Sequence, residues 1–165
     1  METDKRHGEQ DFEHKVHEYA DLVLRLAFIR LGNAADAQDV CQEVLIKLFE
    51  YRNTFNDAEH EKAWIIRVTL HACRDVGRSR WKKRFLLFAE VPLPEVPARS
   101  TEILSQVLAL PSKYRIVIHL HYYEGYRTAE IAELLDLNEN TVRTRLKRGR
   151  ERLKTYLAGG IDDEE

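Results

Sequence analysis

Apolar residues recur along most of this chain at intervals of three and four positions, the spacing that lines one face of an α-helix. No stretch sustains the alternation of apolar and polar residues that is typical of a β-strand. The sequence therefore predicts an all-α protein. In its first half we expect three helices: one from about Val16 that ends at Gly32, one over residues 34–51 that Asn33 caps, and one over residues 58–80.

The helical pattern stops after Arg84, where three prolines fall within the segment 85–100. Proline lacks a backbone N–H and its ring clashes with the preceding turn, so no helix is expected to cross this segment. We therefore expect two small helical domains, residues 10–84 and 101–157, joined by a proline-containing linker, with an acidic tail at 158–165. At ~3.1 Å per residue the extended linker would reach roughly 50 Å, far enough for the domains to contact separate DNA sites.

The second domain contains the pattern of a helix-turn-helix. Thr101 and Pro111 are expected to begin its first two helices, and Gly125 to end the second. Two short helices follow, separated by a turn at Asp136, and Asn138 is expected to cap the last one. Asp136 stands where glycine is commonest, and Asp tolerates the left-handed conformation better than most residues. The apolar residues with the spacing to pack these helices across the turn are Ile131, Ala132, Leu135, Leu137, Val142 and Leu146.

Charge is distributed unevenly along the chain. The formal net charge is −2, yet the segment 139–154 carries seven basic residues against two acidic ones. Lys147 and Arg148 within it are expected to flank DNA phosphates. A solvated charged face is the alternative, but the adjoining helix pair favours DNA contact. The first exposed positions of the last helix are expected to face a major groove: Asn140, Thr141, Arg143, Thr144 and Arg145.

A second basic cluster closes the first domain. Trp64 and Trp81 lie on or beside the same helix, and aromatic rings next to cationic side chains suit the stacking of unpaired bases. Packing in the core is the alternative, which we prefer for Trp64 but not for Trp81. The members of this basic cluster are Arg74, Arg78, Arg80, Lys82, Lys83 and Arg84.

The helix over residues 34–51 has a second, polar stripe. Its acids lie beyond the first turn as well as within it, so the helix dipole alone does not account for them. Acids repel phosphates, and this face would therefore meet a basic protein surface if it is functional; a solvated face is the alternative. The stripe consists of Asp36, Asp39, Gln42, Glu43, Lys47 and Glu50.

Other residue types point away from metal, disulfide, membrane and catalytic chemistry. Cys41 and Cys73 lie far apart on apolar helical faces, which indicates two buried thiols. His119 and His121 are two positions apart on a helix, so their rings point in different directions. No apolar run approaches the ~20 residues of a membrane span, and the N-terminus is charged, so we expect a cytoplasmic protein that inserts into no membrane. No catalytic constellation and no cofactor motif is found.

Three motifs, in order, resemble those of bacterial RNA polymerase sigma factors of the extracytoplasmic-function (ECF) group. "DAQDVCQEVLIKLF" resembles the polymerase-docking segment, "AWIIRV" the melting helix, and "LPSKYRIVIHLHYYEGYRTAEIAELLDLNENTVRTRLKRGRERL" the fourth-region helix-turn-helix. The resemblance covers about residues 12–157. It implies a promoter-specificity subunit without catalysis of its own. The implied partners are core RNA polymerase, promoter DNA and an anti-sigma factor.

The resemblance also implies roles for single residues. Asp39, Gln42 and Glu43, with neighbouring Asp36 and Lys47, stand where the family binds the coiled coil of the polymerase's largest subunit. A further contact to the polymerase flap is implied. The alternative without a polymerase is a stand-alone helix-turn-helix regulator that binds a palindrome as a dimer.

On DNA, the resemblance assigns the minus-thirty-five element to Arg143, Thr144, Arg145 and Arg148. For the minus-ten element, the resemblance places His71 and Asp75 where the family engages bases around a flipped-out base. The basic cluster and its tryptophan, described above from the residues themselves, are expected to belong to the same site: Arg74, Arg78, Arg80, Trp81, Lys82 and Lys83.

Three positions depart from the family pattern. His71 stands where asparagine is frequent, and imidazole and carboxamide offer different hydrogen-bond donors, so the minus-ten sequence does not carry over from the family. Asp75 is an acid expected close to DNA. Arg127 occupies the usual serine cap of the first helix of the helix-turn-helix, and Thr128 is expected to cap it instead.

Overall fold

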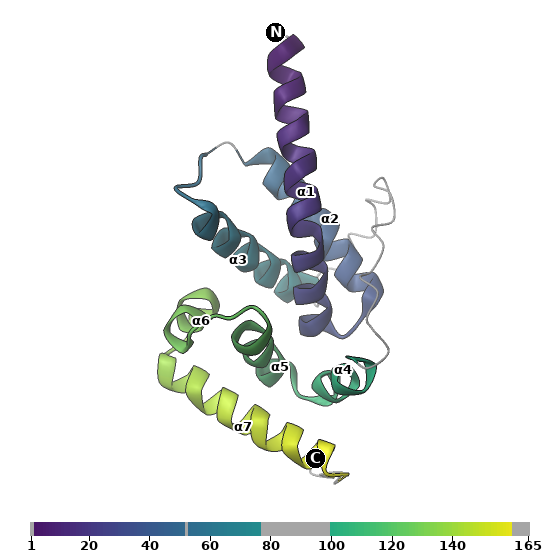
Figure 1. Ribbon diagram of the computed structural model, residues 1–165, viewed down its shortest axis with the longest axis vertical. Coiled ribbons are helices and arrows are strands. Elements are labelled where there is room, and N and C mark those ends of the chain that lie inside the picture. The colour runs from purple at the N-terminus through teal and green to yellow at the C-terminus, as the bar shows by residue number, and fades with distance from the viewer. Residues whose placement is uncertain (1, 52, 77–99, 160–165) are drawn as a thin grey trace. The chain divides into compact units, whose positions relative to one another are not determined.

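The protein is described by a computed structural model covering residues 2–51, 53–76 and 100–159, with side chains from residue 10 in the first range and from residue 103 in the last (Figure 1). These residues form seven α-helices and one short π-helix, and no strand occurs among them. The predicted all-α fold is confirmed. The chain divides into two compact units, Met1–Pro94 and Glu95–Glu165.

The first unit consists of three helices, α1 (Glu2–Leu31), α2 (Ala34–Glu50) and α3 (Ala58–Val76), each packed against the other two. Their apolar stripes meet in a core in which several side chains are fully buried. The predicted helix over 58–80 is described as far as Val76, and its remaining residues lie outside the described ranges. Core members with at most 1% exposure include Val23, Leu24, Leu26, Val40, Val44, Ile65 and Ile66.

Helix α1 begins well before the predicted start at Val16. Residues 2–15 are almost entirely polar, so no apolar stripe marks them as helical in the sequence. Contacts with the rest of the unit hold the second half of this extension: Lys15 pairs with Glu61 of α3 at 2.7 Å, and Phe12 packs edge-on against Phe49 of α2 at 4.9 Å between ring centroids.

The turn between α1 and α2 forms as its sequence predicts. Gly32 adopts a φ of 69°, which ends α1 in the left-handed conformation. Asn33 caps α2, because its Oδ1 accepts a hydrogen bond from the Asp36 N–H at 3.0 Å. The polar stripe of α2 is therefore fixed in register against the core.

The second unit contains α4 (Ser100–Ala109), α5 (Ser112–Ile118), the π-helix η1 (His119–Tyr123), α6 (Thr128–Leu135) and α7 (Glu139–Leu157). Helix α7 packs against α4, α5 and α6. Thr101 lies inside α4, one residue after its start, so its predicted role as the cap of that helix was wrong. Pro111 directly precedes α5, and Gly125, with a φ of 77°, follows the π-helix as the predicted stop.

Candidate nucleic-acid and polymerase interfaces

The helix-turn-helix consists of α6, a tight turn and α7. Asp136 has a φ of 53°, the predicted left-handed conformation, and Asn138 caps α7 by accepting a hydrogen bond from the Asn140 N–H at 2.8 Å. The Leu137 N–H bonds back to the Ala132 carbonyl at 2.9 Å and closes the turn. Five of the six apolar residues predicted to pack here are buried, and Leu137 is half-buried. The hydrophobic contact between the two helices thus fixes which side of α7 faces outward.

The outward side of α7 carries every residue that was predicted to contact upstream DNA. Asn140, Arg143, Thr144, Lys147 and Arg148 are exposed, whereas Thr141 and Arg145 are half-buried. These seven residues are called the reading face below. Val142 and Leu146, on the opposite side of the helix, are 0% and 2% exposed. The arrangement presents amide, hydroxyl and guanidinium groups on a rigid helix, which are the groups that bind base edges and phosphates.

Arg143 of the reading face forms an ion pair within α7. Its Nη2 and Nε lie 2.8 Å and 3.2 Å from Glu139 Oε1, one helical turn earlier. The Arg143 side chain is 64% exposed, so the pair is at the surface. Thr128, at the start of α6, donates its hydroxyl hydrogen to the same carboxylate oxygen at 2.7 Å.

Thr128 was predicted to cap α6, and this prediction was wrong. Thr128 is the first residue of the helix, and its hydroxyl is taken by Glu139. At the start of α6, the backbone N–H of Arg127 instead donates a hydrogen bond to the Glu130 carboxylate at 2.7 Å. The Thr128 hydrogen bond, followed by that from Arg143, lowers the pKa of Glu139 below its ordinary value.

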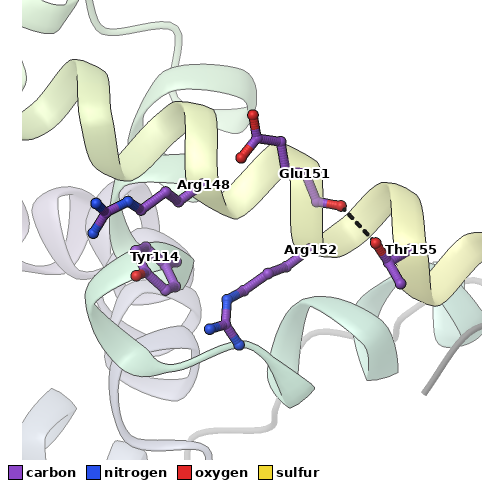
Figure 2. A pocket seen from close by; sticks show the side chains of 5 residues that line it. All are labelled: Tyr114, Arg148, Glu151, Arg152 and Thr155. Carbon is purple, nitrogen blue, oxygen red and sulfur yellow. Dashed lines mark hydrogen bonds between the residues drawn. The ribbon is translucent and has the colours of Figure 1, made fainter. Parts of the chain in front are cut away.

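Beside the reading face, α5 and α7 enclose a hollow of about 340 Å³ that the sequence did not reveal (Figure 2). We call it the Tyr114 hollow. A neighbouring hollow of about 300 Å³ shares Tyr114 and Arg148 with it and extends to Asn140 and Thr144 of the reading face. The Tyr114 hollow is lined by Tyr114, Arg148, Glu151, Arg152 and Thr155.

The polar stripe of α2 is accessible, as the predicted docking role requires. Asp39, Glu43 and Lys47 are exposed, and Asp36 and Gln42 are half-buried. Glu43 and Lys47 form an ion pair at 2.7 Å, with both side chains nearly half exposed. The opposite side of the helix is buried at Ala37, Val40, Cys41, Val44 and Leu48.

The described part of the predicted minus-ten surface lies at the end of α3. His71, Arg74 and Asp75 are three and four positions apart, so they share one face of the helix, and all three are exposed. The adjacent positions Ala72 and Cys73 are buried. The remaining predicted residues, Arg78, Arg80, Trp81, Lys82 and Lys83, lie outside the described ranges.

Trp64 belongs to an aromatic cluster at the start of α3. Its ring centroid lies 4.7 Å from that of Tyr51 and 5.5 Å from that of Phe55. Tyr51 and Phe55 are themselves stacked at 4.7 Å and an interplanar angle of 13°. Trp64 is half-buried by this cluster. The sequence does not reveal these contacts: Tyr51 follows the last residue of α2 and Phe55 lies outside any helix, so helical periodicity does not pair either ring with Trp64.

The cysteines and histidines have the separate environments that their positions predicted. Cys41 and Cys73 are buried free thiols, and burial raises the pKa of each to about 12. His119 lies 3.4 Å from Glu124, whereas His121 Nδ1 is 2.8 Å from the Tyr126 carbonyl oxygen. Among the described residues, no helix has both the length and the apolar content needed to cross a bilayer.

Comparison with known proteins gives matches along both units. Residues 16–83 match the family model for Sigma-70 region 2, and residues 100–153 match that for Sigma-70, region 4. The chain is 33% identical to "ECF RNA polymerase sigma factor SigW" of Bacillus subtilis strain 168, an alignment that covers 91% of each chain. It is 32% identical to "ECF RNA polymerase sigma factor SigE" of Mycolicibacterium smegmatis, over 87% of this chain and 60% of that one.

Solved structures show the same fold. The sigma factor RpoE of Bartonella quintana, in complex with the anti-sigma factor NepR, has a TM-score of 0.67 and 19% identity, covering 94% of this chain and 99% of that chain. CnrH, in complex with the cytosolic domain of CnrY, has a TM-score of 0.63 and 24% identity over 93% and 91%. A stand-alone regulator is not favoured, because region 2 accounts for the first unit. The chain therefore belongs to the ECF group of RNA polymerase sigma factors, the subunits that bind core RNA polymerase and direct it to promoters.

Proposed function

We propose that the reading face of α7 recognises the minus-thirty-five element. The observation that carries this proposal is the burial of Val142 and Leu146 against the rest of the helix-turn-helix, which leaves Asn140, Arg143 and Thr144 outward near the start of α7. In helix-turn-helix proteins the first residues of the second helix contact base edges in the major groove. Arginine can bind guanine through two hydrogen bonds, so Arg143 and Arg145 are the residues expected to contribute most to specificity.

The polar stripe of α2 is proposed to bind the coiled coil of the polymerase's largest subunit. Asp39 and Glu43 are exposed acids on a helix whose other side is locked into the core. Such a face repels DNA phosphates and attracts a basic protein surface. Gln42 and Lys47 add hydrogen-bonding groups at the same face, and contact with the polymerase flap is proposed for the protein as a whole.

The exposed end of α3 is proposed to act at the minus-ten element. His71 and Arg74 offer nitrogen donors to bases and phosphates, while Asp75 offers only acceptors when ionised. Asp75 is therefore suited to an exocyclic amino group of a base and not to the phosphate backbone. Arg78, Arg80, Trp81, Lys82 and Lys83 are assigned to the same interface from the sequence alone.

We further propose where the protein acts and what regulates it. Acting with RNA polymerase, it would work in the cytoplasm, catalyse no reaction itself and require no cofactor. The fold-level relatives described above were solved with an anti-sigma factor or a cytosolic partner domain, and an anti-sigma factor is the regulator proposed here. The domain limits 10–84, 85–100, 101–157 and 158–165 are part of the proposal.

Run-off transcription with core polymerase on a library of genomic fragments tests the function as a whole. We expect transcripts from a small set of fragments that share two spaced elements, and only when both the protein and core polymerase are present. A gel shift with the protein alone should show weak binding, because the net charge of −2 gives little overall attraction to the phosphate backbone. Tight binding to a palindrome without polymerase would contradict the proposal.

A further inference from the structure

Tyr114 is held against α7 by a close helix contact. Gly149 allows this contact, because a Cβ atom at that position would lie 3.1 Å from Ile118 Cγ1 and 3.4 Å from Tyr114 Cβ. The absence of a side chain at Gly149 therefore lets α5 approach α7 closely at Ile118, one helical turn after Tyr114. Tyr114 is 5% exposed overall, so its position is fixed by packing.

Three cationic side chains surround this tyrosine. The Lys113 Nζ lies 5.1 Å and the Arg152 Cζ 5.6 Å from the centroid of the Tyr114 ring. Burial would raise the pKa of Tyr114, but a hydrogen bond from Arg148 and the charges of Lys113 and Arg152 hold it below its ordinary value. The surroundings of the hydroxyl group therefore favour negative charge.

The hydroxyl group also retains a proton that it can donate. A guanidinium group has donors and no acceptor, so the Tyr114 oxygen accepts the hydrogen bond from Arg148. No acceptor for the Tyr114 proton is recorded among the described residues. Glu151 lines the hollow, but Figure 2 shows its carboxylate pointing away from Tyr114, and Arg148 and Arg152 on either side of the ring.

We propose that the Tyr114 hollow binds one phosphate of the DNA backbone at the edge of the upstream element, with Tyr114 as hydrogen-bond donor and Arg148 and Arg152 as flanking cations. This inference rests on the proposed role of the reading face. A DNA backbone is favoured over a small free anion because the neighbouring hollow joins Tyr114 and Arg148 to Asn140 and Thr144 of that face. A duplex bound there would carry its phosphates past the Tyr114 hollow. Such a contact fixes the register of the helix on DNA without reading a base.

Methylphosphonate scanning of the upstream element tests the proposal. Each backbone position in turn is made neutral, and binding by the full-length protein with core polymerase is measured for wild type, Tyr114→Phe and Arg152→Gln. Wild type should lose roughly tenfold in affinity at one or two adjacent positions, as for a hydrogen bond to a charged group. Tyr114→Phe should lose a similar factor on unmodified DNA, equally on all base sequences. At those positions the methyl group should weaken Tyr114→Phe less than wild type, because only the contacts of Arg148 and Arg152 remain to be lost.

Arg150→Gln is the matched control, because it removes the same charge from an exposed position of α7. The Arg150 guanidinium group lies outside the Tyr114 hollow and donates a hydrogen bond to the Tyr122 hydroxyl oxygen at 3.0 Å. Arg152→Gln should lower the slope of log affinity against log salt by about 0.9, the value for one lost phosphate contact, and Arg150→Gln should not. Thermal unfolding of each variant confirms that the fold is retained.

If the affinity lost through Tyr114→Phe and the affinity lost through the methylphosphonate simply added at every backbone position, the inference would be overturned. The proposed role of the reading face would not be affected by that result. The inference would also be overturned if inorganic phosphate bound to the wild type but not to Tyr114→Phe, while both proteins lost the same affinity at every methylphosphonate position. That result would assign the hollow to a small anion. Failure of the wild-type complex to discriminate the upstream element at all would instead contradict the proposed function.

Discussion

Glu139 Oε1 holds the guanidinium group of Arg143 at 2.8 Å, across one turn of α7. The same oxygen accepts the hydroxyl hydrogen of Thr128 from α6, so one carboxylate joins the two helices of the helix-turn-helix to an arginine of the reading face. Held in this way, the Arg143 side chain has fewer orientations available before DNA binds. An orientation selected in advance reduces the entropy lost on binding.

Glu139→Gln should therefore weaken the recognition of one base pair more than it weakens the fold. The amide keeps a hydrogen-bond acceptor for Thr128 but loses the charge that attracts Arg143. We expect a smaller ratio between binding of the upstream element and binding of a variant changed at the Arg143 base pair, measured by fluorescence anisotropy with the polymerase complex. The melting temperature should hardly change. Equal weakening on both DNAs would show that Glu139 does not position Arg143.

Lowering the pH should reduce discrimination at the Arg143 base pair, as Glu139→Gln does, because protonation removes the charge of Glu139. The pKa of Glu139 is lowered from its ordinary 4.5, so its contribution is present above that pH and is lost as the pH falls through the lower folded-state value. Discrimination at the Arg143 base pair should be constant at neutral pH. The Glu139→Gln variant should show no corresponding loss in acid.

Substitution of the arginines themselves tests direct readout. Arg143→Ala or Arg145→Ala should reduce binding to upstream-element DNA by roughly 1 to 3 kcal/mol if the contact is to a base edge. The measurement is a titration of each variant complex on matched and single-base-changed duplexes. A loss of the same size on every sequence would indicate a phosphate contact.

Charge reversal on α2 tests the docking face. Asp39→Lys combined with Glu43→Lys should weaken co-purification with core polymerase, because both acids are exposed and the proposed partner surface is basic. The fold should persist, since neither side chain is part of the core. Glu13→Lys combined with Glu59→Lys, at exposed positions of α1 and α3, is the control for the same change of net charge. Unchanged binding of core polymerase by the double variant would refute the docking assignment.

The two cysteines should be chemically inert in the folded protein. With pKa values of about 12, Cys41 and Cys73 are almost entirely protonated at pH 8, and only the thiolate reacts. Alkylation by iodoacetamide, followed by mass spectrometry, should be slow in native buffer and fast for both thiols in guanidinium chloride. Rapid labelling of either cysteine in the native protein would show that the first unit opens or packs differently.

The parts of this protein that sequence predicts best are those in which local chemistry and burial agree. Asn33 and Asn138 have side chains that can cap a helix, and Asp136 tolerates the left-handed conformation. All three are found in the predicted role. The polar stripe of α2 and the reading face of α7 follow from the period of the apolar residues behind them. Knowing which side of a helix is buried identified most of the exposed residues, although Thr141, Arg145, Asp36 and Gln42 are half-buried.

Features that depend on contacts between elements were missed. Thr128 and Glu139 are eleven positions apart and meet only once the turn has formed, so the hydroxyl predicted as a cap serves the carboxylate instead. Tyr114 resembles any other apolar-face residue in the sequence, and its cationic neighbours come largely from α7. The polar first half of α1 has no apolar stripe that would reveal it as a helix.

Site-specific photocrosslinking within a reconstituted promoter complex tests most directly the central claim, that DNA contact and polymerase contact lie on separate helices. A photoreactive residue is placed at position 144 on α7 or at position 39 on α2, and the crosslinked products are identified. Position 144 should crosslink to upstream-element DNA, and position 39 to the largest polymerase subunit. Crosslinks from position 39 to DNA, or from position 144 to polymerase alone, would contradict the account.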